Sequence, residues 1–468
     1  MRNAECGVHA ALRTPHSARK AATVSMISLG CPRTLVDSEL YLGRLKQAGY
    51  GVAEQVEGSD VVLINTCAFI KESIQESVDT ILQAVELRKH GKVRAVVVAG
   101  CLVQRFKQQL ITALPEVDGF VGVDGFGDIT ALVQRTLRGE QPEAIRQRPR
   151  LPHRGGRVAR SALTPSHYAY LKISEGCLKG CSFCVIPKIK GPLASRPLED
   201  VVEEARQLVE ERGVSELIVV GQDTSDYGVD LYGRARIAEL LAALGRLDGL
   251  RWIRLLYCHP RGVSRELIEV IRDEPRICKY LDTAIEHADD AVLQRMNRRM
   301  TRAQLRETIA RLREQIPGMT LRTSVIVGFP GETAAAFEHL LAFLREMRFE
   351  RLGAFRYSNE EGAAAFRDPD QVPEAVTHAR FDRLMRLQQE IAAEVNRQFL
   401  GRVCDVVIDE PDPNDPTQFL GRTSADCPEV DGLVYVHSPK PLPSGAYLPV
   451  RITDSYEYDL VAEPVELP

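Results

Sequence analysis

The chain has 468 residues, of which 44% are hydrophobic and 26% are charged, values that are ordinary for a soluble globular protein of two to four domains. It contains no run of 18 or more apolar residues, so we expect no membrane span, and its formal net charge of −4 gives no general indication of nucleic-acid binding. Its eleven cysteines without a signal peptide predict a reducing, cytoplasmic compartment, where thiols bind metals or serve catalysis more often than they form disulfides.

The amino-terminal part of the chain predicts a short extension followed by a parallel-sheet domain. Residues 1–23 carry four basic residues against one acid and no apolar pattern, so we expect a disordered extension; a start assigned too early, before Met26, is the alternative. From residue 24 to residue 138, short apolar runs alternate with longer amphipathic ones, which is typical of βα units. The expected strands are residues 24–29, 60–65, 93–99 and 117–121, with a helix at 71–89.

A basic segment without periodicity follows this domain. Residues 139–165 contain four prolines, and seven arginines occur between Arg138 and Arg160. Proline and the absence of an apolar pattern predict a linker. Its arginines are interpreted as solvated, with contact to ribosomal RNA as the alternative.

Two further domains are expected after the linker. Apolar strands, each followed by a helical pattern, occur near residues 168–174, 216–220, 252–257, 280–285, 321–327 and 352–357, and the helix 198–212 has one apolar face. Six such units in residues 166–395 predict a partial TIM-type barrel, because a closed one needs eight. After a last helix near 379–399, short runs broken by proline and glycine predict a small all-β barrel within 396–468. The predicted fold class is therefore α/β with a small all-β domain at the carboxyl end.

The strongest chemical signal is the run Cys177-Leu-Lys-Gly-Cys181-Ser-Phe-Cys184, which directly follows the first barrel strand. Active sites of such barrels lie at the carboxyl ends of the strands. Three thiolates so close in sequence can bind three irons of a 4Fe-4S cluster and leave the fourth iron open. A structural zinc site is the alternative, but tetrahedral zinc needs four ligands and no second Cys or His pair follows at zinc-finger spacing.

Three further cysteines, Cys31, Cys67 and Cys101, each come just after the end of an expected strand in the amino-terminal domain. The carboxyl ends of parallel strands share one edge, so these thiols should converge there as ligands of a second three-cysteine cluster. The alternative is three unrelated buried cysteines, since free cysteine is among the most buried residue types. The remaining cysteines, assigned to packing or to the surface, are Cys6, Cys258, Cys278, Cys404 and Cys427.

The CxxxCxxC run after the first strand of a six-unit barrel resembles the radical S-adenosylmethionine (SAM) superfamily. That resemblance implies that SAM chelates the open iron and is cleaved to a 5'-deoxyadenosyl radical. The residues that the resemblance places against SAM are Gly221, Gln222, Asp223, Glu286, Gly328 and Gly331. Tight turns alone would also account for the glycines, and Glu286 stands where related sequences tend to carry glutamine. His259 and His287 lie near strand ends and are assigned no function.

Two open clusters in one chain resemble the methylthiotransferases, a family in which the auxiliary cluster supplies the sulfur. This resemblance extends from Met26 to the end of the chain. Residues 28–39, 222–232 and 421–432 are similar to the RimO branch, which modifies an aspartate of ribosomal protein S-twelve. The MiaB branch, which modifies an adenosine of transfer RNA, is the alternative.

The carboxyl-terminal domain resembles a TRAM domain, the OB-like substrate-handling module of these enzymes. Residues 396–468 contain five basic and thirteen acidic residues, a local charge of −8. A surface that binds RNA must neutralise phosphates with Lys and Arg, so we expect this domain to repel transfer RNA and to attract a basic protein. An acidic face that only keeps the domain in solution is the alternative.

The residues and the resemblance together predict an enzyme with two 4Fe-4S clusters that methylthiolates the β-carbon of an aspartate in S-twelve, on or near the small ribosomal subunit. One SAM would donate methyl to cluster-bound sulfur, a second would yield the radical that removes hydrogen, and an electron donor is required. The trio of Cys177, Cys181 and Cys184 should be essential for cofactor cleavage, and the other trio only for sulfur insertion. A non-catalytic iron-sulfur carrier that docks on ribosomes is the alternative from another class.

Overall fold

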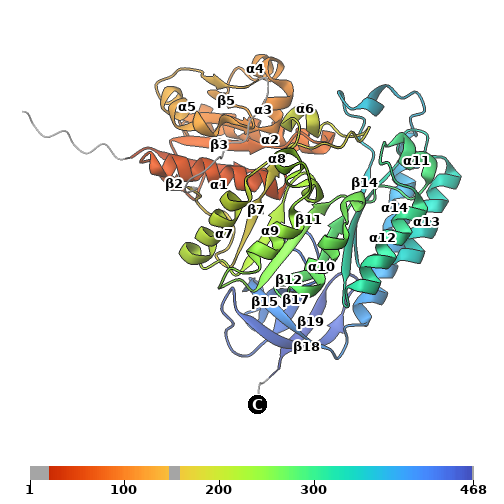
Figure 1. Ribbon diagram of the computed structural model, residues 1–468. Helices are drawn as coiled ribbons and strands as arrows, with labels where there is room; N and C mark the ends of the chain where they lie inside the picture. Colours follow the sequence, from red (N-terminus) through yellow and green to blue (C-terminus); the bar gives the residue numbers. More distant parts are fainter. Residues whose placement is uncertain (1–20, 147–158, 466–468) are drawn as a thin grey trace, which may run out of the picture.

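The computed structural model describes residues 21–146 and 159–465. The predicted extension at 1–23 falls almost wholly outside these ranges, as does the middle of the predicted linker. Figure 1 shows a layered amino-terminal part, a central barrel-like sheet and a small β-barrel at the opposite end of the molecule. Among the helices of the described ranges, none combines the length and the apolar character needed to cross a bilayer.

The amino-terminal sheet, as far as the chain is described, consists of six parallel strands in the order β2-β1-β3-β4-β5-β6. These strands are β1 (Thr23–Ser28), β2 (Gly51–Ala53), β3 (Val61–Thr66), β4 (Ala95–Gly100), β5 (Gly119–Val121) and β6 (Glu143–Ala144). The connecting helices are α1 (Pro32–Gln47), α2 (Lys71–Lys89), α3 (Cys101–Phe106), α4 (Gln108–Ala113), η1 (Gly125–Gly127) and α5 (Ile129–Thr136). Every residue of β3 and β4 is buried, because α1 and α5 cover one face of the sheet and α2, α3 and α4 cover the other.

The central sheet of the described chain is also six-stranded and parallel, in the order β14-β13-β12-β11-β10-β7. Its strands are β7 (Tyr168–Lys172), β10 (Glu216–Val220), β11 (Trp252–Cys258), β12 (Ile277–Thr283), β13 (Thr320–Val327) and β14 (Arg351–Arg356). The outer helices are α7 (Leu198–Arg212), α9 (Ile237–Leu244), α10 (Arg265–Asp273), α12 (Arg302–Gln315), α13 (Ala334–Met347) and α14 (Glu374–Arg397). Shorter elements are β8 (Ser174–Glu175), α6 (Ile186–Lys190), β9 (Ala194–Ser195), η2 (Thr224–Asp226), α8 (Val229–Tyr232), η3 (Pro260–Gly262), α11 (Asp290–Arg295) and η4 (Ala364–Arg367). Since β7 and β14 do not pair with each other, the sheet forms a partial barrel.

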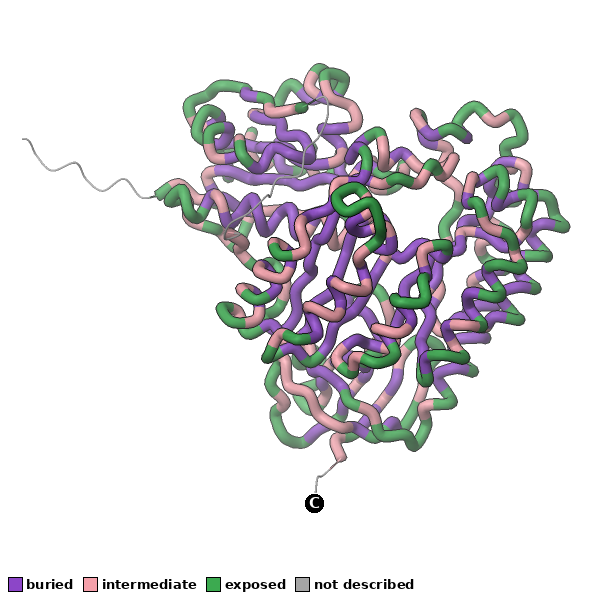
Figure 2. Tube along the Cα trace, viewed as in Figure 1, coloured by how far each residue is buried: buried purple, intermediate pink, exposed green. Residues whose placement is uncertain are grey.

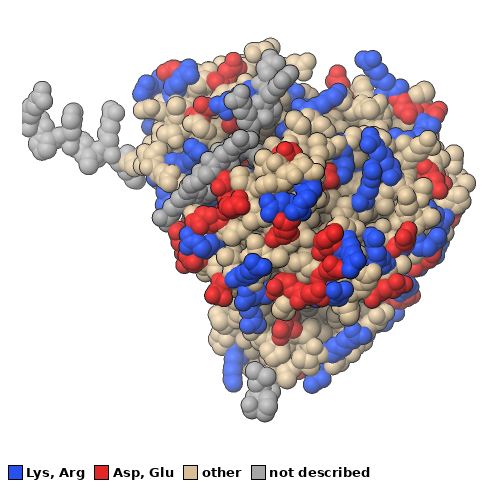
Figure 3. Space-filling view, viewed as in Figure 1, with Lys and Arg blue, Asp and Glu red and all other residues tan. Residues whose placement is uncertain are grey.

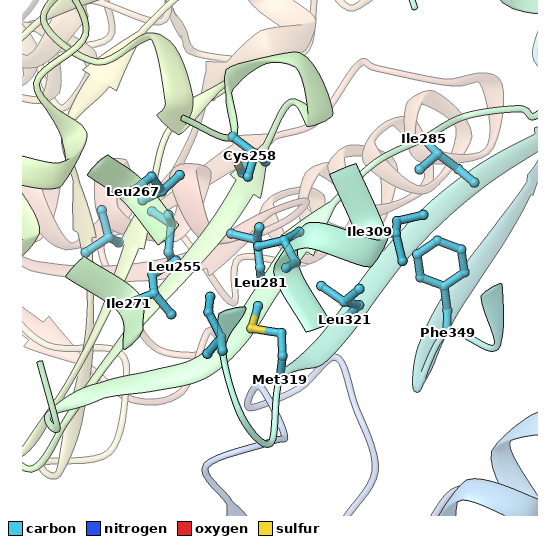
Figure 4. Close-up of a cluster of buried hydrophobic side chains, with 14 of the residues drawn as sticks. Leu255, Cys258, Leu267, Ile271, Leu281, Ile285, Ile309, Met319, Leu321 and Phe349 are labelled. Carbon is cyan, nitrogen blue, oxygen red and sulfur yellow. The ribbon is translucent and has the colours of Figure 1, made fainter. Parts of the chain in front are cut away.

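The largest hydrophobic core lies between this sheet and its outer helices. Figure 4 shows Leu255 and Leu281 of the strands facing Leu267 and Ile309 of the helices. In Figure 2 the strands of both sheets are buried, while exposed residues gather on the outer helix faces and loops. This packing fixes the strand ends, where the candidate site lies.

The carboxyl-terminal domain is a closed barrel in the order β15-β16-β17-β19-β18. Its strands are β15 (Val403–Pro411), β16 (Gln418–Thr423), β17 (Val434–His437), β18 (Tyr447–Ser455) and β19 (Leu460–Pro464). It covers the amino-terminal ends of the central strands: the rings of Trp252 and Tyr447 are 4.9 Å apart, and the Tyr168 hydroxyl donates to Glu429 over 3.2 Å. The carboxyl-terminal barrel therefore lies at the end of the central sheet away from the candidate site.

The predicted fold class is confirmed, including the partial barrel and the small all-β barrel. The helices predicted at 71–89 and 198–212 have these bounds in the structure. The domain boundaries stay predictions. The interpretation of the linker arginines as solvated is wrong for Arg160, which is buried between the carboxylates of Glu39 and Glu204.

Candidate active site with two cysteine trios

The loop after β8 places three cysteine thiols at the carboxyl end of the central sheet. These are Cys177, Cys181 and Cys184, called here the barrel trio. The backbone N–H groups of Lys179 and Ile186 donate to the first and last thiol over 3.3 and 3.5 Å. The middle thiol accepts a hydrogen bond of 3.3 Å from Nη1 of Arg298. These donors favour the thiolate, the form that binds iron, and so oppose the effect of burial on Cys177 and Cys184.

The amino-terminal sheet brings the other three cysteines to one edge. Cys31 precedes α1, Cys67 follows β3 and Cys101 begins α3, and together they are called here the auxiliary trio. The strands that lead to them, β1, β3 and β4, are direct neighbours in the sheet. The Sγ of Cys67 lies only 3.2 Å from the position that a Cβ on Gly30 would take, so the glycine lets the two loops approach.

The pKa values of the thiols reflect burial first and the neighbouring charges second. Burial raises the pKa of Cys101 to about 12, and the neighbouring charges of Cys67 and Cys31 add to that effect. Burial also raises the pKa of Cys177 to about 11 and that of Cys184 to about 12. For Cys31, burial is outweighed by the guanidinium of Arg33, which lowers the pKa to about 7. Clustered thiolates that disfavour one another need a cationic partner, and an iron-sulfur cluster supplies it.

The accessibility of the six thiols fits clusters that keep an open iron. All six thiols are partly exposed, whereas Cys258, Cys278 and Cys427 are packing residues buried in hydrophobic cores. Nowhere in the described ranges do three His, Cys, Asp or Glu side chains converge on a point as the ligands of a single metal ion do. Cys6 lies outside the described residues.

Contacts across the domain junction bring the two trios into one site. Nη1 of Arg33 donates to the carbonyl of Gly221, at the end of β10, over 3.1 Å. Val185, next to the barrel trio, packs with Ile189 in a small apolar cluster that Cys101 joins. In Figure 1 the helices α3 and α6 from the two domains lie close together at this junction, and their residues are in contact.

A buried ionic cluster lies beside the junction. The ammonium of Lys190 is 3.3 Å from Asp37 of α1 and 3.4 Å from Glu175, and the ammonium of Lys172 pairs with the same two carboxylates. Burial would raise the pKa of Glu175, but the two ammonium groups lower it well below its usual range. Two charges of each sign offset one another, so the domain junction buries them in matched pairs.

A second bridge joins the auxiliary trio to the segment after β14. The guanidinium of Arg105 donates to the carbonyl of Ala68, the residue after Cys67, over 2.9 Å. It also pairs with Glu360 at 2.9 Å in a buried position and donates to the carbonyl of Glu361. The auxiliary trio is therefore fixed to the barrel on two sides.

The residues expected to contact SAM differ in their surroundings. Gly221, Gln222 and Asp223 lie at the junction: the Gln222 amide donates to Glu175 over 3.0 Å, and its buried Oε1 has no partner. Asp223 accepts from the backbone of Ser225 and lies 3.3 Å from the Lys179 ammonium of the barrel-trio loop. This turn is thus in place to position both the loop and a ligand.

The two glycines after β13 are required by protein packing. A Cβ on Gly328 would meet Thr377 at 2.2 Å, and one on Gly331 would meet the Arg295 guanidinium at 2.5 Å. Both also have a positive φ, of 78° and 80°, so the tight-turn alternative accounts for them without a ligand, and their contact with adenosine stays a prediction. Glu286 has a positive φ of 66° and a pKa raised by burial, with Asp282 adding to the effect and Arg298 opposing it. Strained backbone at a strand end is typical of functional sites.

Both histidines near strand ends have structural hydrogen bonds. Nδ1 of His259 accepts from the backbone N–H of Arg261 over 3.1 Å, and Nδ1 of His287 accepts from that of Asp289 over 3.0 Å. Both contacts are local, and no function is assigned to either histidine.

Gly176→Ala should strongly reduce iron binding by the barrel trio. Gly176 has φ +69°, and a Cβ there would lie 2.0 Å from the carbonyl oxygen of Pro192. The methyl group must push the Cys177 loop away from the segment that follows α6. We expect the variant to retain severalfold less iron after reconstitution, measured by iron analysis and by the EPR signal of the reduced cluster.

Gly213→Ala is the matched control for this prediction. Gly213 has the same φ of +69°, but a Cβ there would meet no atom within 4 Å. Its free energy of unfolding should fall by about 1–2 kcal/mol, because alanine is strained in a left-handed backbone conformation. Its iron content should stay at the wild-type value. Equal iron contents in the two variants would contradict a steric role of Gly176.

The acidic character of the carboxyl-terminal domain is weaker at its surface than in its sequence. Asp409, Asp426 and Asp431 pair with Arg422, Arg351 and Arg322, mostly at the boundary with the central sheet. Among the described residues of this domain, the exposed acids are Asp405, Glu410, Asp415, Glu429, Asp454, Glu457 and Glu463, against exposed Arg397, Arg402, Lys440 and Arg451. Figure 3 shows acidic and basic side chains interspersed over the visible face. The surface remains net acidic, but the local charge of −8 overstates it.

Three family models match successive parts of the chain. Residues 23–122 match the model described as Uncharacterized protein family UPF0004, residues 171–344 match the Radical SAM superfamily, and residues 400–465 match the TRAM domain. The second of these covers both the barrel trio and the predicted SAM turns, while the first covers the auxiliary trio.

Curated relatives match almost the whole chain. The chain is 43% identical over 438 residues to "Ribosomal protein uS12 methylthiotransferase RimO" of Lachnoclostridium phytofermentans, covering 94% of this chain and 99% of that protein. It is 44% identical over 442 residues to the protein of the same name from Geobacter sulfurreducens, covering 94% and 98%. Among solved structures, the radical SAM methyltransferase TsrM of Kitasatospora setae, with cobalamin and a 4Fe-4S cluster bound, has a TM-score of 0.51 at 15% identity and covers 72% of both chains. That structural likeness concerns the fold alone.

Proposed function

Because the chain belongs to the RimO family of ribosomal protein uS12 methylthiotransferases, we propose that it methylthiolates the β-carbon of an aspartate in uS12 (S-twelve) with two 4Fe-4S clusters. As a radical SAM enzyme it uses SAM and a 4Fe-4S cluster. The observation that supports the second cluster is the auxiliary trio, whose loops are fixed to the barrel domain through Arg33 and Arg105. An electron donor and access to uS12 on or near the small ribosomal subunit, in the cytoplasm, are further parts of the proposal.

The residues have separate tasks in this scheme. Cys177, Cys181 and Cys184 would hold one cluster and Cys31, Cys67 and Cys101 the other. With SAM bound, these groups supply a hydrogen-abstracting radical and the sulfur and methyl group that are transferred. The turn at residues 221–223 positions the barrel-trio loop through Lys179, and the apolar cluster around Val185 limits water between the trios. Exclusion of water protects a radical from side reactions.

The proposal is tested by the product. Purified, anaerobically reconstituted protein is incubated with SAM, a reductant and either uS12 or an unmodified transfer RNA, and both are analysed by mass spectrometry. We expect uS12 to gain one SCH3 group in place of hydrogen at a single aspartate, with no change in the transfer RNA. Modification of the transfer RNA alone would overturn the proposal.

Two alternatives predict other outcomes. Transfer RNA as substrate is disfavoured by the net acidic surface of the carboxyl-terminal domain, because phosphate binding needs basic residues. A non-catalytic carrier would bind clusters but release no 5'-deoxyadenosine. Detection of 5'-deoxyadenosine, which the radical reaction forms, eliminates the carrier.

A further inference from the structure

Each trio has one thiol that receives a hydrogen bond from an arginine. Nε of Arg33 donates to Sγ of Cys31 over 3.3 Å, and Nη1 of Arg298 donates to Sγ of Cys181 over 3.3 Å. Each guanidinium uses a second nitrogen for a backbone carbonyl at a strand end of the barrel, Gly221 for the first and Ala284 for the second. The two arginines therefore fix one ligand of each trio relative to the barrel.

Arg33 differs from Arg298 because it reaches across the domain junction. It comes from the first turn of α1, in the amino-terminal domain, but its second hydrogen bond and its stacking partner belong to the barrel. Its Cζ lies 4.8 Å from the centre of the Tyr257 ring, and Tyr257 has a positive φ of 57° at the end of β11. A planar guanidinium can donate in two directions while stacking on a ring, which an ammonium group cannot do. One side chain thus connects the auxiliary trio, the predicted SAM turn and a strained strand end.

We propose that Arg33 is a positioning residue that holds the Cys31 thiolate against the barrel and raises the reduction potential of a cluster on the auxiliary trio, as Arg298 does for the barrel trio. The inference rests on the proposed function for the presence of that second cluster. Hydrogen bonds to the sulfurs of a cluster stabilise its reduced, more negative form, and such bonds are among the factors that set cluster potentials. Because each arginine contacts only one trio, each should act on one cluster.

The expected results form a crossed pattern. Arg33→Gln should lower the equilibrium constant between the reduced and the oxidised auxiliary cluster about tenfold. For a one-electron couple this shifts the reduction potential by about 59 mV to a more negative value. The barrel cluster of this variant should keep its potential. Arg298→Gln should shift the barrel cluster and leave the auxiliary cluster unchanged. The potentials are measured by EPR-monitored redox titration of the full-length protein with both clusters.

Two more variants keep the test decisive if Arg33→Gln binds its cluster poorly. Arg33→Lys keeps the positive charge but cannot bond to Cys31 and Gly221 while stacking on Tyr257, so an intermediate shift is expected. Tyr257→Leu leaves every donor atom in place but removes the stacking surface, so a smaller shift in the same direction is expected. Unchanged auxiliary potentials in these variants, or equal shifts of both clusters, would overturn the role of Arg33.

Iron analysis separates failure of this inference from failure of the proposed function. An iron content of about eight per chain in the wild-type protein would mean that both clusters are present. A content of about four would mean that the auxiliary cluster is absent, which would overturn both proposals. Eight irons with unshifted potentials would overturn the role of Arg33 alone.

Discussion

Replacing Cys181 with alanine should abolish the reductive cleavage of SAM. The barrel trio offers three thiols to the cluster, and the middle one is the thiol to which Arg298 donates. A cluster held by two thiolates has no fixed geometry for an open iron, so SAM cannot be chelated in a reactive position. The measurement is 5'-deoxyadenosine released with a chemical reductant, quantified by chromatography, and we expect none above background.

Cys67→Ala separates the tasks of the two trios. It should still release 5'-deoxyadenosine, because the barrel trio is intact, but should form no methylthiolated uS12. Cys404→Ala is a matched control, since Cys404 lies in the carboxyl-terminal barrel and should keep both activities. If Cys67→Ala with an intact barrel cluster also released no 5'-deoxyadenosine, the division of labour would be wrong.

The ends of the strands that lead to the auxiliary trio could be predicted from the sequence, because the end of an apolar run is a local feature. Cys31, Cys67 and Cys101 all follow apolar runs, and the neighbouring positions of β1, β3 and β4 place them at one edge, as predicted. Strands β2 and β6 were missed because they have three and two residues, too few for a periodic pattern to appear. Local patterns therefore predict which strand each cysteine follows, but they do not predict short strands at the edges of the sheet.

The residues that join the domains could not be predicted in this way. Arg33 and Gly221 are 188 positions apart, and nothing in the residues around either one indicates the other. A signal existed for Arg33, which stands two residues after Cys31, but a basic residue near a thiol has many structural explanations. Arg298 and Arg105 carry no local signal. Their roles follow only from the three-dimensional arrangement of the strand ends.

The position of the carboxyl-terminal barrel likewise depends on contacts distant in the sequence. It covers the amino-terminal ends of the central strands, whereas the barrel trio lies at their carboxyl-terminal ends and the auxiliary trio lies on the amino-terminal domain that packs there. Several of its acids are used at this boundary, including Asp426 with Arg351. A protein substrate that contacts this barrel and also delivers a side chain to the trios must extend along the length of the central domain. Substrate docking by this barrel stays a prediction.

Glu216→Gln should destabilise the protein more than any surface substitution, by about 3–5 kcal/mol. Glu216 is fully buried at the start of β10 and lies between two buried arginines. It accepts a hydrogen bond from Nε of Arg254 over 3.0 Å and pairs with Arg422 of the carboxyl-terminal barrel at 2.9 Å. A neutral amide would leave Arg254 without its carboxylate and Arg422 with only Asp409. Uncompensated buried charge is the physical reason for the expected loss.

The measurement is the urea midpoint of unfolding, followed by tryptophan fluorescence, because the single tryptophan, Trp252, packs on Tyr447 at the same boundary. Glu210→Gln is the matched control: Glu210 pairs with Arg206 on the exposed face of α7, where ion pairs contribute little to stability. Its midpoint should stay at the wild-type value, while that of Glu216→Gln falls. Equal midpoints for the two variants would show that the carboxyl-terminal barrel is held to the central sheet by its apolar contacts and not by the buried ion pairs.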